Sequence, residues 1–267
     1  MDFVLQILRE IVFTASKWLL PLRLPIASNS RRTMRIDQEN VGTIRKRGTS
    51  FRIQRELDAI AFVRKHTSIP VPSIFDVQVC GHDSWILMQR APGTRLDSAW
   101  PDMPENNKAT TITQLKAYFE QLRNIRLSAS DWIGSCDNGP VYDHRLNNGF
   151  PCGPFTSISE FHDFLVVPVM QCPRPELAVE YRKRLSDDYP INFTHADLSY
   201  EHIFVDEENG NVTGIIDWEM AGFFPGWWEY RKALYGSRQQ RWWIDLVNSV
   251  MPCYGKELEV DSDLEAF

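Results

Sequence analysis

The stretch "FTHADLSYEHIFVD", residues 193–206, places two histidines, two aspartates and one glutamate within fourteen positions. Its last residues are apolar and β-branched, which is typical of a strand. A partner strand is expected at "VTGIID" (212–217), because the "EENGN" between the two runs contains an Asn-Gly pair that favours a tight hairpin turn. The hairpin would bring Asp217 close to Asp197 and His202. The sequence therefore predicts a cluster of oxygen and nitrogen ligands around one cleft.

Composition limits the class of protein. The 267 residues are 43% hydrophobic and 12% aromatic, which is enough for one large domain or for two small ones that share a cleft. A net charge of −6 and a pI near 5.6 argue against a nucleic-acid partner, because binding to a phosphate backbone needs clustered Lys and Arg. The five cysteines form no C-x-x-C pair. We therefore expect reduced thiols and a cytoplasmic protein, with neither a disulfide framework nor a thiolate zinc site.

The first 26 residues are apolar, but Arg9, Glu10 and Lys17 interrupt them and Pro21 ends the run. Neither a signal peptide nor a membrane-spanning helix fits this pattern. We expect an amphipathic helix that packs on its own domain, with a helix on a membrane surface as the alternative. No firm membrane association is predicted.

Alternating short elements fill the next part of the chain. A strand is expected at 41–48 and a helix at 51–66, where apolar residues recur at helical spacing until a proline-rich stretch follows. Strands at 73–80 and 84–90 flank the turn "GHD". The Pro- and Gly-containing connector after residue 90 then marks a boundary between two lobes. The predicted domains are 1–90 and 91–267.

The second lobe is predicted to be mainly helical. Helices are expected at 108–125, 157–170, 226–236 and 238–251, and a long loop rich in Gly, Pro and Asn at 134–155. A loop of that length inside a compact domain is usually functional or mobile. The acidic end, 257–267, is expected to be solvated. The predicted fold class is α+β, with an antiparallel sheet and one helix in the small N-terminal lobe.

The spacing in the opening stretch suits phosphoryl transfer. That reaction needs a carboxylate to orient and deprotonate the attacking hydroxyl, and separate ligands for divalent cations. Residues 195–202, H-A-D-L-S-Y-E-H, follow the kinase pattern H-x-D-x-x-x-x-N, with His202 in place of Asn. A transition-metal hydrolase site is an alternative, because two histidines and a carboxylate suit zinc or iron. On a strand-like segment, however, His195 and Asp197 would share one face while His202 lies beyond a turn.

The order of motifs resembles that of the aminoglycoside phosphotransferase family, especially its fungal members, within the protein-kinase-like fold. The resemblance covers residues from about 40 to 235. It rests on seven ordered blocks: "TIRKRG", "RELDAIAFV", "HTSIPVP", "WILMQRAPGTRL", "GPVYDHRL", "FTHADLSYEHIFVD" and "GIIDWEMAG". The resemblance implies a two-lobed kinase-like fold.

The resemblance also implies a nucleotide site between the lobes. Lys46 would contact the nucleotide phosphates and Glu56 would pair with it, although Arg45 and Arg47 leave open which cation points inward. Backbone N–H and C=O groups of Gln89 and Ala91 would hold the purine ring. No glycine-rich phosphate loop precedes Lys46, which argues against protein-kinase activity.

The implied roles in the opening stretch are distinct. Asp197 resembles the catalytic base, His195 a residue that orients the loop, and Asp217 the principal metal ligand. His202 would be a second metal ligand, and its imidazole should change metal preference because magnesium favours oxygen donors.

The implied activity is transfer of the γ-phosphate of ATP, or alternatively of GTP, to the hydroxyl of a small molecule, with Mg²⁺ or Mn²⁺ as cofactor. A nucleotide-binding pseudokinase, or a kinase fold that uses its cleft for other chemistry, is the alternative.

For the acceptor side, Asp143, His144 and Arg145 either face the cleft or stabilise their own loop. The tryptophans at 227, 228, 242 and 243 either pack in the core or stack on a ring-shaped acceptor.

Overall fold

The computed structural model describes residues 35–81, 83–125, 132–235 and 240–267. The helix predicted within residues 1–26 lies outside them. Among the described residues, no helix combines the length and the apolar character that crossing a membrane requires. The cytoplasmic location stays a prediction.

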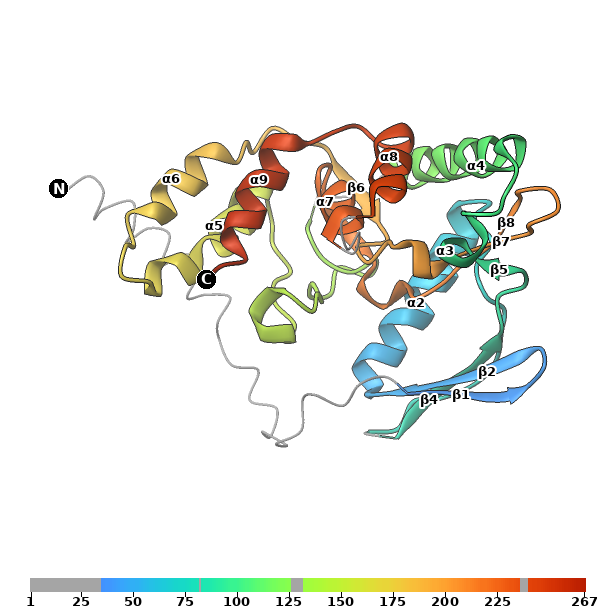
Figure 1. The fold of residues 1–267 in the computed structure, drawn as a ribbon. Coiled ribbons are helices and arrows are strands. Elements are labelled where there is room, and N and C mark those ends of the chain that lie inside the picture. The colour runs from blue at the N-terminus through green and yellow to red at the C-terminus, as the bar shows by residue number, and fades with distance from the viewer. Residues whose placement is uncertain (1–34, 82, 126–131, 236–239) are drawn as a thin grey trace.

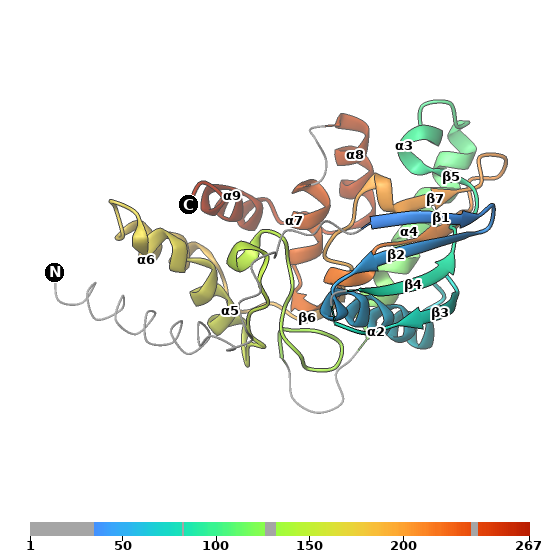
Figure 2. The ribbon, with the colours of Figure 1, turned by 90° about the horizontal axis from the view of Figure 1, so that it is seen from below.

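The N-terminal part is an antiparallel sheet backed by one long helix. The sheet has the strand order β1-β2-β4-β3, and it lies at the end of the molecule opposite α5, α6 and α9 (Figures 1 and 2). The elements are β1 (Arg35–Asn40), β2 (Thr43–Gly48), α2 (Ser50–His66), β3 (Ile74–Gln78) and β4 (Ser84–Gln89). Helix α2 begins after Thr49, whose hydroxyl caps the Arg52 amide. The prolines at 70 and 72 follow its end, as the sequence predicts.

The remaining chain is mainly helical, with two small sheets. The helices are α3 (Leu96–Ala99), α4 (Glu105–Asn124), α5 (Ile158–Leu165), α6 (Leu177–Arg184), α7 (Trp228–Tyr235), α8 (Arg241–Val250) and α9 (Gly255–Leu264). The 3₁₀ turns are η1 (Leu146–Gly149), η2 (Val167–Gln171), η3 (Tyr200–His202) and η4 (Trp218–Met220). The sheets are β5-β7-β8, from Thr94–Arg95, Ile203–Val205 and Val212–Ile215, and β6-β9, from Ile191–Thr194 and Gly222–Pro225. The predicted α+β class, with an antiparallel sheet before a mainly helical part, is confirmed.

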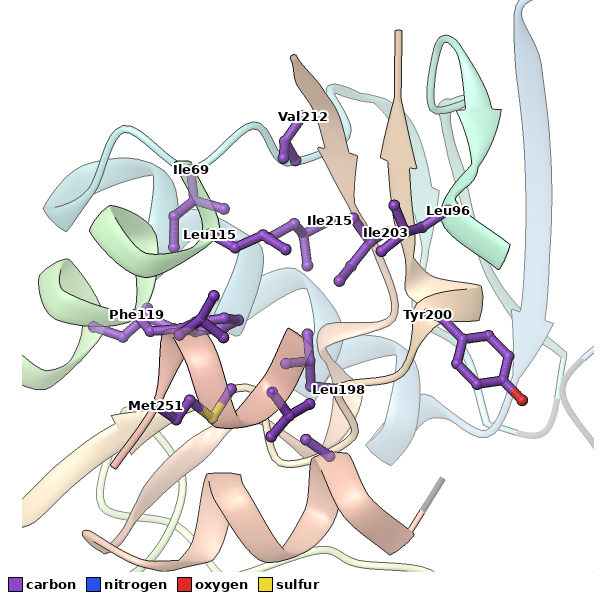
Figure 3. Packing of buried hydrophobic residues seen from close by; sticks show 14 of the residues in the cluster. Ile69, Leu96, Leu115, Phe119, Leu198, Tyr200, Ile203, Val212, Ile215 and Met251 are labelled. Carbon is purple, nitrogen blue, oxygen red and sulfur yellow. The ribbon is translucent and has the colours of Figure 1, made fainter. Parts of the chain in front are cut away.

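The hairpin predicted from the opening stretch is present as β7 and β8. Ile203 lies opposite Ile215, and the turn closes with a hydrogen bond from Gly210 N–H to the Asp206 carbonyl, 2.8 Å. One face of the hairpin packs on helix α4 through Leu115, as Figure 3 shows. The burial of these side chains fixes which way the hairpin faces, because a shift by one residue would turn its apolar residues to solvent.

Two expectations for the second lobe are wrong. The predicted helix 157–170 divides, because α5 ends at Leu165 and a 3₁₀ turn with Pro168 near its start follows. The acidic end 257–267 is not a solvated tail, because it forms α9, in which Val260 and Asp261 are buried. An aspartate of this helix, Asp261, is buried here because a cation from another element, Arg231, pairs with it at 2.6 Å.

The tryptophans near the C-terminus are structural. Trp227, Trp228 and Trp243 are fully buried, which confirms core packing for all three. Trp242 is half-buried and stacks on Trp100, with ring centroids 5.3 Å apart. The sequence left open whether these four tryptophans stack on a ring-shaped acceptor. The described ring contacts of all four are with other side chains of the protein and do not support that alternative.

Candidate active site

The loop 195–202 connects β6 to β7 and carries most of the predicted site. It starts with a strained backbone, because Ala196 has φ +60°, a left-handed conformation that costs an alanine roughly 1–2 kcal/mol. The carboxylate of Glu229, on α7, accepts the N–H groups of His195 at 2.5 Å and of Ala196 at 3.3 Å. These two bonds hold the turn that aims His195 and Asp197 in different directions.

His195 is fully buried and both of its ring nitrogens are occupied. Nε2–H donates to the Ile216 carbonyl at 2.8 Å, and Nδ1 accepts the Asp197 N–H at 3.2 Å. Burial lowers the pKa of His195 to about 3, so the ring is neutral at physiological pH. This geometry suits a residue that orients the loop. It also leaves His195 without a lone pair for a metal. One of the two histidines that a transition-metal hydrolase site would need is therefore not available as a ligand.

His202 is oriented as a metal ligand would be. Its Nδ1 lies 2.7 Å from the Asp197 carbonyl and donates to it, which in the neutral ring leaves the lone pair on Nε2. Nε2 lies 3.7 Å from Asp217 Oδ2. Ligand atoms of Asp197, His202 and Asp217 all lie within 4.8 Å of one another. Two carboxylates and one imidazole in this spacing are a donor set that fits a divalent cation.

Lys46 is the inward-pointing cation of β2. Its Nζ lies 2.6 Å from Glu56 Oε2 on α2 and 2.6 Å from Asp217 Oδ1. Arg45 instead stacks over Trp85 at 4.3 Å, and Arg47 pairs with Asp37 at 3.0 Å. The structure therefore brings Lys46, Glu56 and Asp217 together across 171 positions of sequence.

The carboxylates around Lys46 and the lysine shift one another's pKa values. Burial alone would lower the pKa of Lys46, but the carboxylates of Glu56, Asp217 and Glu219 raise it well above its usual range. Burial would raise the pKa of Asp217, yet Lys46 and His202 lower it well below its usual range. Asp217 is therefore ionised, as a metal ligand must be. It also adopts a left-handed backbone, with φ +69°, which aspartate tolerates better than most residues.

The sequence-based prediction missed the residues that fix helix α2. Arg52 pairs with the buried carboxylate of Glu219, and Arg55 donates to the backbone carbonyls of Glu219 at 2.9 Å, Ala221 at 3.1 Å and Pro140 at 2.6 Å. These bonds tie α2, and with it Glu56, to the segment that follows Asp217. A signal was present, because Glu219 and Glu229 are the two carboxylates of the otherwise apolar stretch 218–230, and a buried carboxylate needs a partner.

The predicted purine-binding residues lie where the chain leaves β4. The N–H of Gln89 already donates to the Ser73 carbonyl at 2.8 Å, so this N–H is not available to a base. Ala91 is nearly buried and lies against Gly214 on β8, where an added Cβ would come 3.0 Å from the Cβ of Ala91. The glycine therefore lets the connector approach the hairpin closely.

A cavity of about 950 Å³ opens beside Asp197. Asp197 lines it, together with His144 and Arg145 from the long loop, which confirms that this loop contributes to a cleft. Asp143 is instead fully buried and pairs with Lys232 at 2.8 Å.

Burial raises the pKa of Asp197, which brings the carboxylate closer to the proton affinity that a general base needs.

The fold and these contacts define a class of protein. A lysine paired with a helix glutamate, a carboxylate on the loop before a β-hairpin, and a second carboxylate after it together form the arrangement of kinase-like phosphotransferases. The chain belongs to the phosphotransferase enzyme family, whose sequence pattern matches residues 24–243. Members of this class transfer phosphate to small molecules.

Solved structures show the same fold. An aminoglycoside-3'-phosphotransferase of type VIII matches with a TM-score of 0.52 and 15% identity, over 88% of this chain and 94% of that chain. Aminoglycoside phosphotransferase APH(3'')-Id from Streptomyces rimosus ATCC10970, in complex with ADP and streptomycin, matches with 0.52 and 14%, over 85% and 87%. A GDP complex of an aminoglycoside 2'-phosphotransferase-IIIa mutant gives 0.52 and 14%, over 89% and 80%. No curated protein sequence matches the chain.

Proposed function

We propose that the protein transfers the γ-phosphate of ATP to a hydroxyl group of a small molecule. One observation carries the proposal: Asp197 belongs both to the metal-binding group with His202 and Asp217 and to the wall of the 950 Å³ cavity. A carboxylate at this junction can accept a proton from a hydroxyl in the cavity while the phosphate lies on the side of Asp217. The lobes 1–90 and 91–267 would hold the nucleotide between them.

Each proposed residue has a role that its contacts support. Asp197 would orient and deprotonate the acceptor hydroxyl. Lys46, held by Glu56, would stabilise the phosphate charge once the nucleotide replaces its contact with Asp217. The carbonyl of Gln89 and the backbone of Ala91 would hold the base. His195 would keep the loop in place.

The metal site fits Mg²⁺ or Mn²⁺. Asp217 and His202 would hold the cation, because Asp217 is ionised and His202 presents Nε2 toward it. A divalent cation there would neutralise the negative charge of the nucleotide phosphates. The imidazole donor favours Mn²⁺ more than an amide oxygen would.

A pair of variants tests the proposal. Asp197→Asn should keep nucleotide binding, seen as a rise in melting temperature with ADP and Mg²⁺ or Mn²⁺, and should lose transfer by about 10²–10⁴-fold. Asp217→Ala should lose the nucleotide-induced shift. Asp188→Asn, an exposed aspartate, makes the same chemical change outside the cleft and should behave as the wild type. Transfer is read as a mass gain of one phosphate in a metabolite extract.

The same measurements separate the enzyme from a pseudokinase. The intact Lys46–Glu56 pair and the placement of Asp197 favour an enzyme. A wild-type protein that shows no melting shift with any nucleotide and metal would exclude the proposed function. Wild-type transfer by Asp197→Asn would exclude Asp197 as the base.

A further inference from the structure

Lys46 is the shared counter-ion of three carboxylates. Its Nζ lies 2.6 Å from Glu56 Oε2, 2.6 Å from Asp217 Oδ1 and 3.7 Å from Glu219 Oε2. Oxygen atoms of these three carboxylates lie within 4.8 Å of one another, a spacing that suits a cation, and the ammonium group of Lys46 takes that place. The lysine that the proposed function assigns to the nucleotide phosphates is therefore engaged before a nucleotide arrives.

Glu219 is the one of these carboxylates to which the proposed function gives no role. Its side chain is 2% exposed, and the guanidinium of Arg52 binds both of its oxygens, with 3.2 Å from Nε to Oε2. Burial alone would raise its pKa, but contact with His144 and the charges of Lys46 and Arg52 lower it. Glu219 is therefore ionised, and it places a negative charge beside the lysine that the phosphates need.

The charges around Lys46 do not balance. Three carboxylates contribute −3 and two cations contribute +2, so the group has a net charge of −1; its members are Lys46, Arg52, Glu56, Asp217 and Glu219. An anionic nucleotide that arrives without a cation meets this excess of negative charge. A divalent cation on Asp217 would change the net charge from −1 to +1.

The same cation would also release Lys46. Asp217 offers Oδ1 to Lys46, and its Oδ2 lies 3.7 Å from Nε2 of His202. A metal held by Asp217 and His202 would draw on the charge of the carboxylate that now attracts the lysine. The phosphates could then compete with Asp217 for the ammonium group.

We infer that Glu219 makes nucleotide binding depend on the divalent cation, and that Arg52 limits the size of this dependence. The inference rests on the proposed function and concerns the control of the same site. Glu219 is a positioning residue here, because it acts on the nucleotide through Lys46 and Asp217 and not by contact.

The expected effect follows from the distance between the charges. An oxygen of Glu219 lies within 4.8 Å of an oxygen of Asp217, which puts the carboxylate within about 9 Å of a cation bound to either oxygen of Asp217. At an effective dielectric constant of about 20, unit charges at that distance change an equilibrium constant roughly twentyfold. Salt and water in the cleft reduce the effect. We therefore expect a change of at least about fivefold.

Binding of ADP measures this dependence without an acceptor. The dissociation constant is determined by equilibrium dialysis at pH 8, once with EDTA and once with Mg²⁺, and the ratio of the two values is the metal dependence. Burial raises the pKa of Glu56 to about 7, so pH 8 keeps that carboxylate ionised. Glu219→Gln should lower the ratio at least about fivefold, because metal-free ADP binds more tightly and Mg²⁺ more weakly. Binding of adenosine, which has no phosphate, should stay unchanged.

Variants of Arg52 separate charge from structure. Arg52→Gln should raise the ratio at least about fivefold, because it removes a positive charge from the same group. Arg52→Lys keeps the charge but breaks the two-oxygen contact, and should leave the ratio within about twofold of the wild type. A purely structural role predicts the same direction of change for Glu219→Gln and Arg52→Gln, since each breaks the same contact between α2 and η4.

The double variant Arg52→Gln with Glu219→Gln restores the net charge of −1. Its ratio should return to within about twofold of the wild type. It leaves neither of the two charges buried and unpaired, so it also serves if Glu219→Gln alone does not fold.

An exposed pair of the same chemistry provides the control. Arg174 and Glu176 lie 3.5 Å apart just before α6, at the end of the molecule opposite the N-terminal sheet (Figure 1). Glu176→Gln and Arg174→Gln make the same changes of charge there, and neither should alter the ratio.

Three results would overturn the inference. The first is an equal affinity of the wild type for ADP with EDTA and with Mg²⁺, and the second is an unchanged ratio in Glu219→Gln. The third is a change in the same direction in Glu219→Gln and Arg52→Gln. Failure of the proposed function is a different result, because the wild type would then bind no ADP even with Mg²⁺.

Discussion

Replacing His195 by glutamine should flatten the acid side of the protein's stability curve. His195 is fully buried and neutral, with a pKa of about 3, against about 6.5 in the unfolded chain. Between these two values the unfolded chain binds more protons than the folded one, so stability rises with pH and is lost on acidification below 6.5. For this pair of pKa values, lowering the pH from 7 to 5 removes about 2 kcal/mol of folding free energy. Glutamine does not titrate and keeps an N–H at the position of Nε2.

The assay is urea unfolding of the wild type and of His195→Gln at pH 7 and at pH 5. The loss of unfolding free energy between the two pH values should be smaller in the variant by about 2 kcal/mol, whatever the variant's absolute stability. His66→Gln is the matched control, because that imidazole is exposed and is solvated in both states. An equal pH dependence in His195→Gln and wild type would show that His195 is not held neutral by burial.

Three further predictions concern the residues around the cleft. His202→Asn should keep transfer and move the metal preference toward Mg²⁺, measured as the ratio of activities with Mg²⁺ and Mn²⁺; loss of activity with both metals would mean that the imidazole has another role. Arg55→Ala removes the donor to two buried carbonyls and one partly buried carbonyl and should lower the unfolding free energy by about 3 kcal/mol in urea, whereas Arg64→Ala, which removes the donor to one, should cost about 1 kcal/mol or less. Lys46→Met should weaken ATP binding and cost about 3–5 kcal/mol of stability, and adding Glu56→Gln should recover at least about 1 kcal/mol if the two charges are coupled.

Local patterns were sufficient for the elements near the site. The period of apolar residues predicts α2, and the Asn-Gly turn predicts the β7–β8 hairpin, because both depend on contacts within one short segment. The division of residues 157–170 into α5 and η2 was missed, although Pro168 is a local signal, because the apolar run continues across it. Helix α9 was missed for another reason: one of its acidic residues, Asp261, is buried against cations from elsewhere in the chain.

The candidate site also combines features that the local sequence predicts with features that only contacts between distant segments decide. The spacing of His195, Asp197 and His202 is local, and the sequence alone identifies them as a group. The inward direction of Lys46, rather than of Arg45 or Arg47, follows from the pairing of β2 with its neighbours and from the position of α2. Alternation along the strand puts Lys46 on the face opposite to Arg45 and Arg47, but it does not say which of the two faces points inward.

By itself, the sequence determined that this chain is an α+β protein whose opening stretch carries a candidate base and candidate metal ligands before a hairpin, because those features depend on residue type and short spacing. The tertiary structure alone decided which charges remain available. Asp261 and Glu265 belong to the end that the sequence predicts to be solvated, and Asp143 to a loop whose direction the sequence leaves open, yet folding places Arg145, Arg231 and Lys232 against them. The chemistry that a cavity offers depends on charges that are left unpaired, and pairing between distant segments is fixed only when the chain is folded.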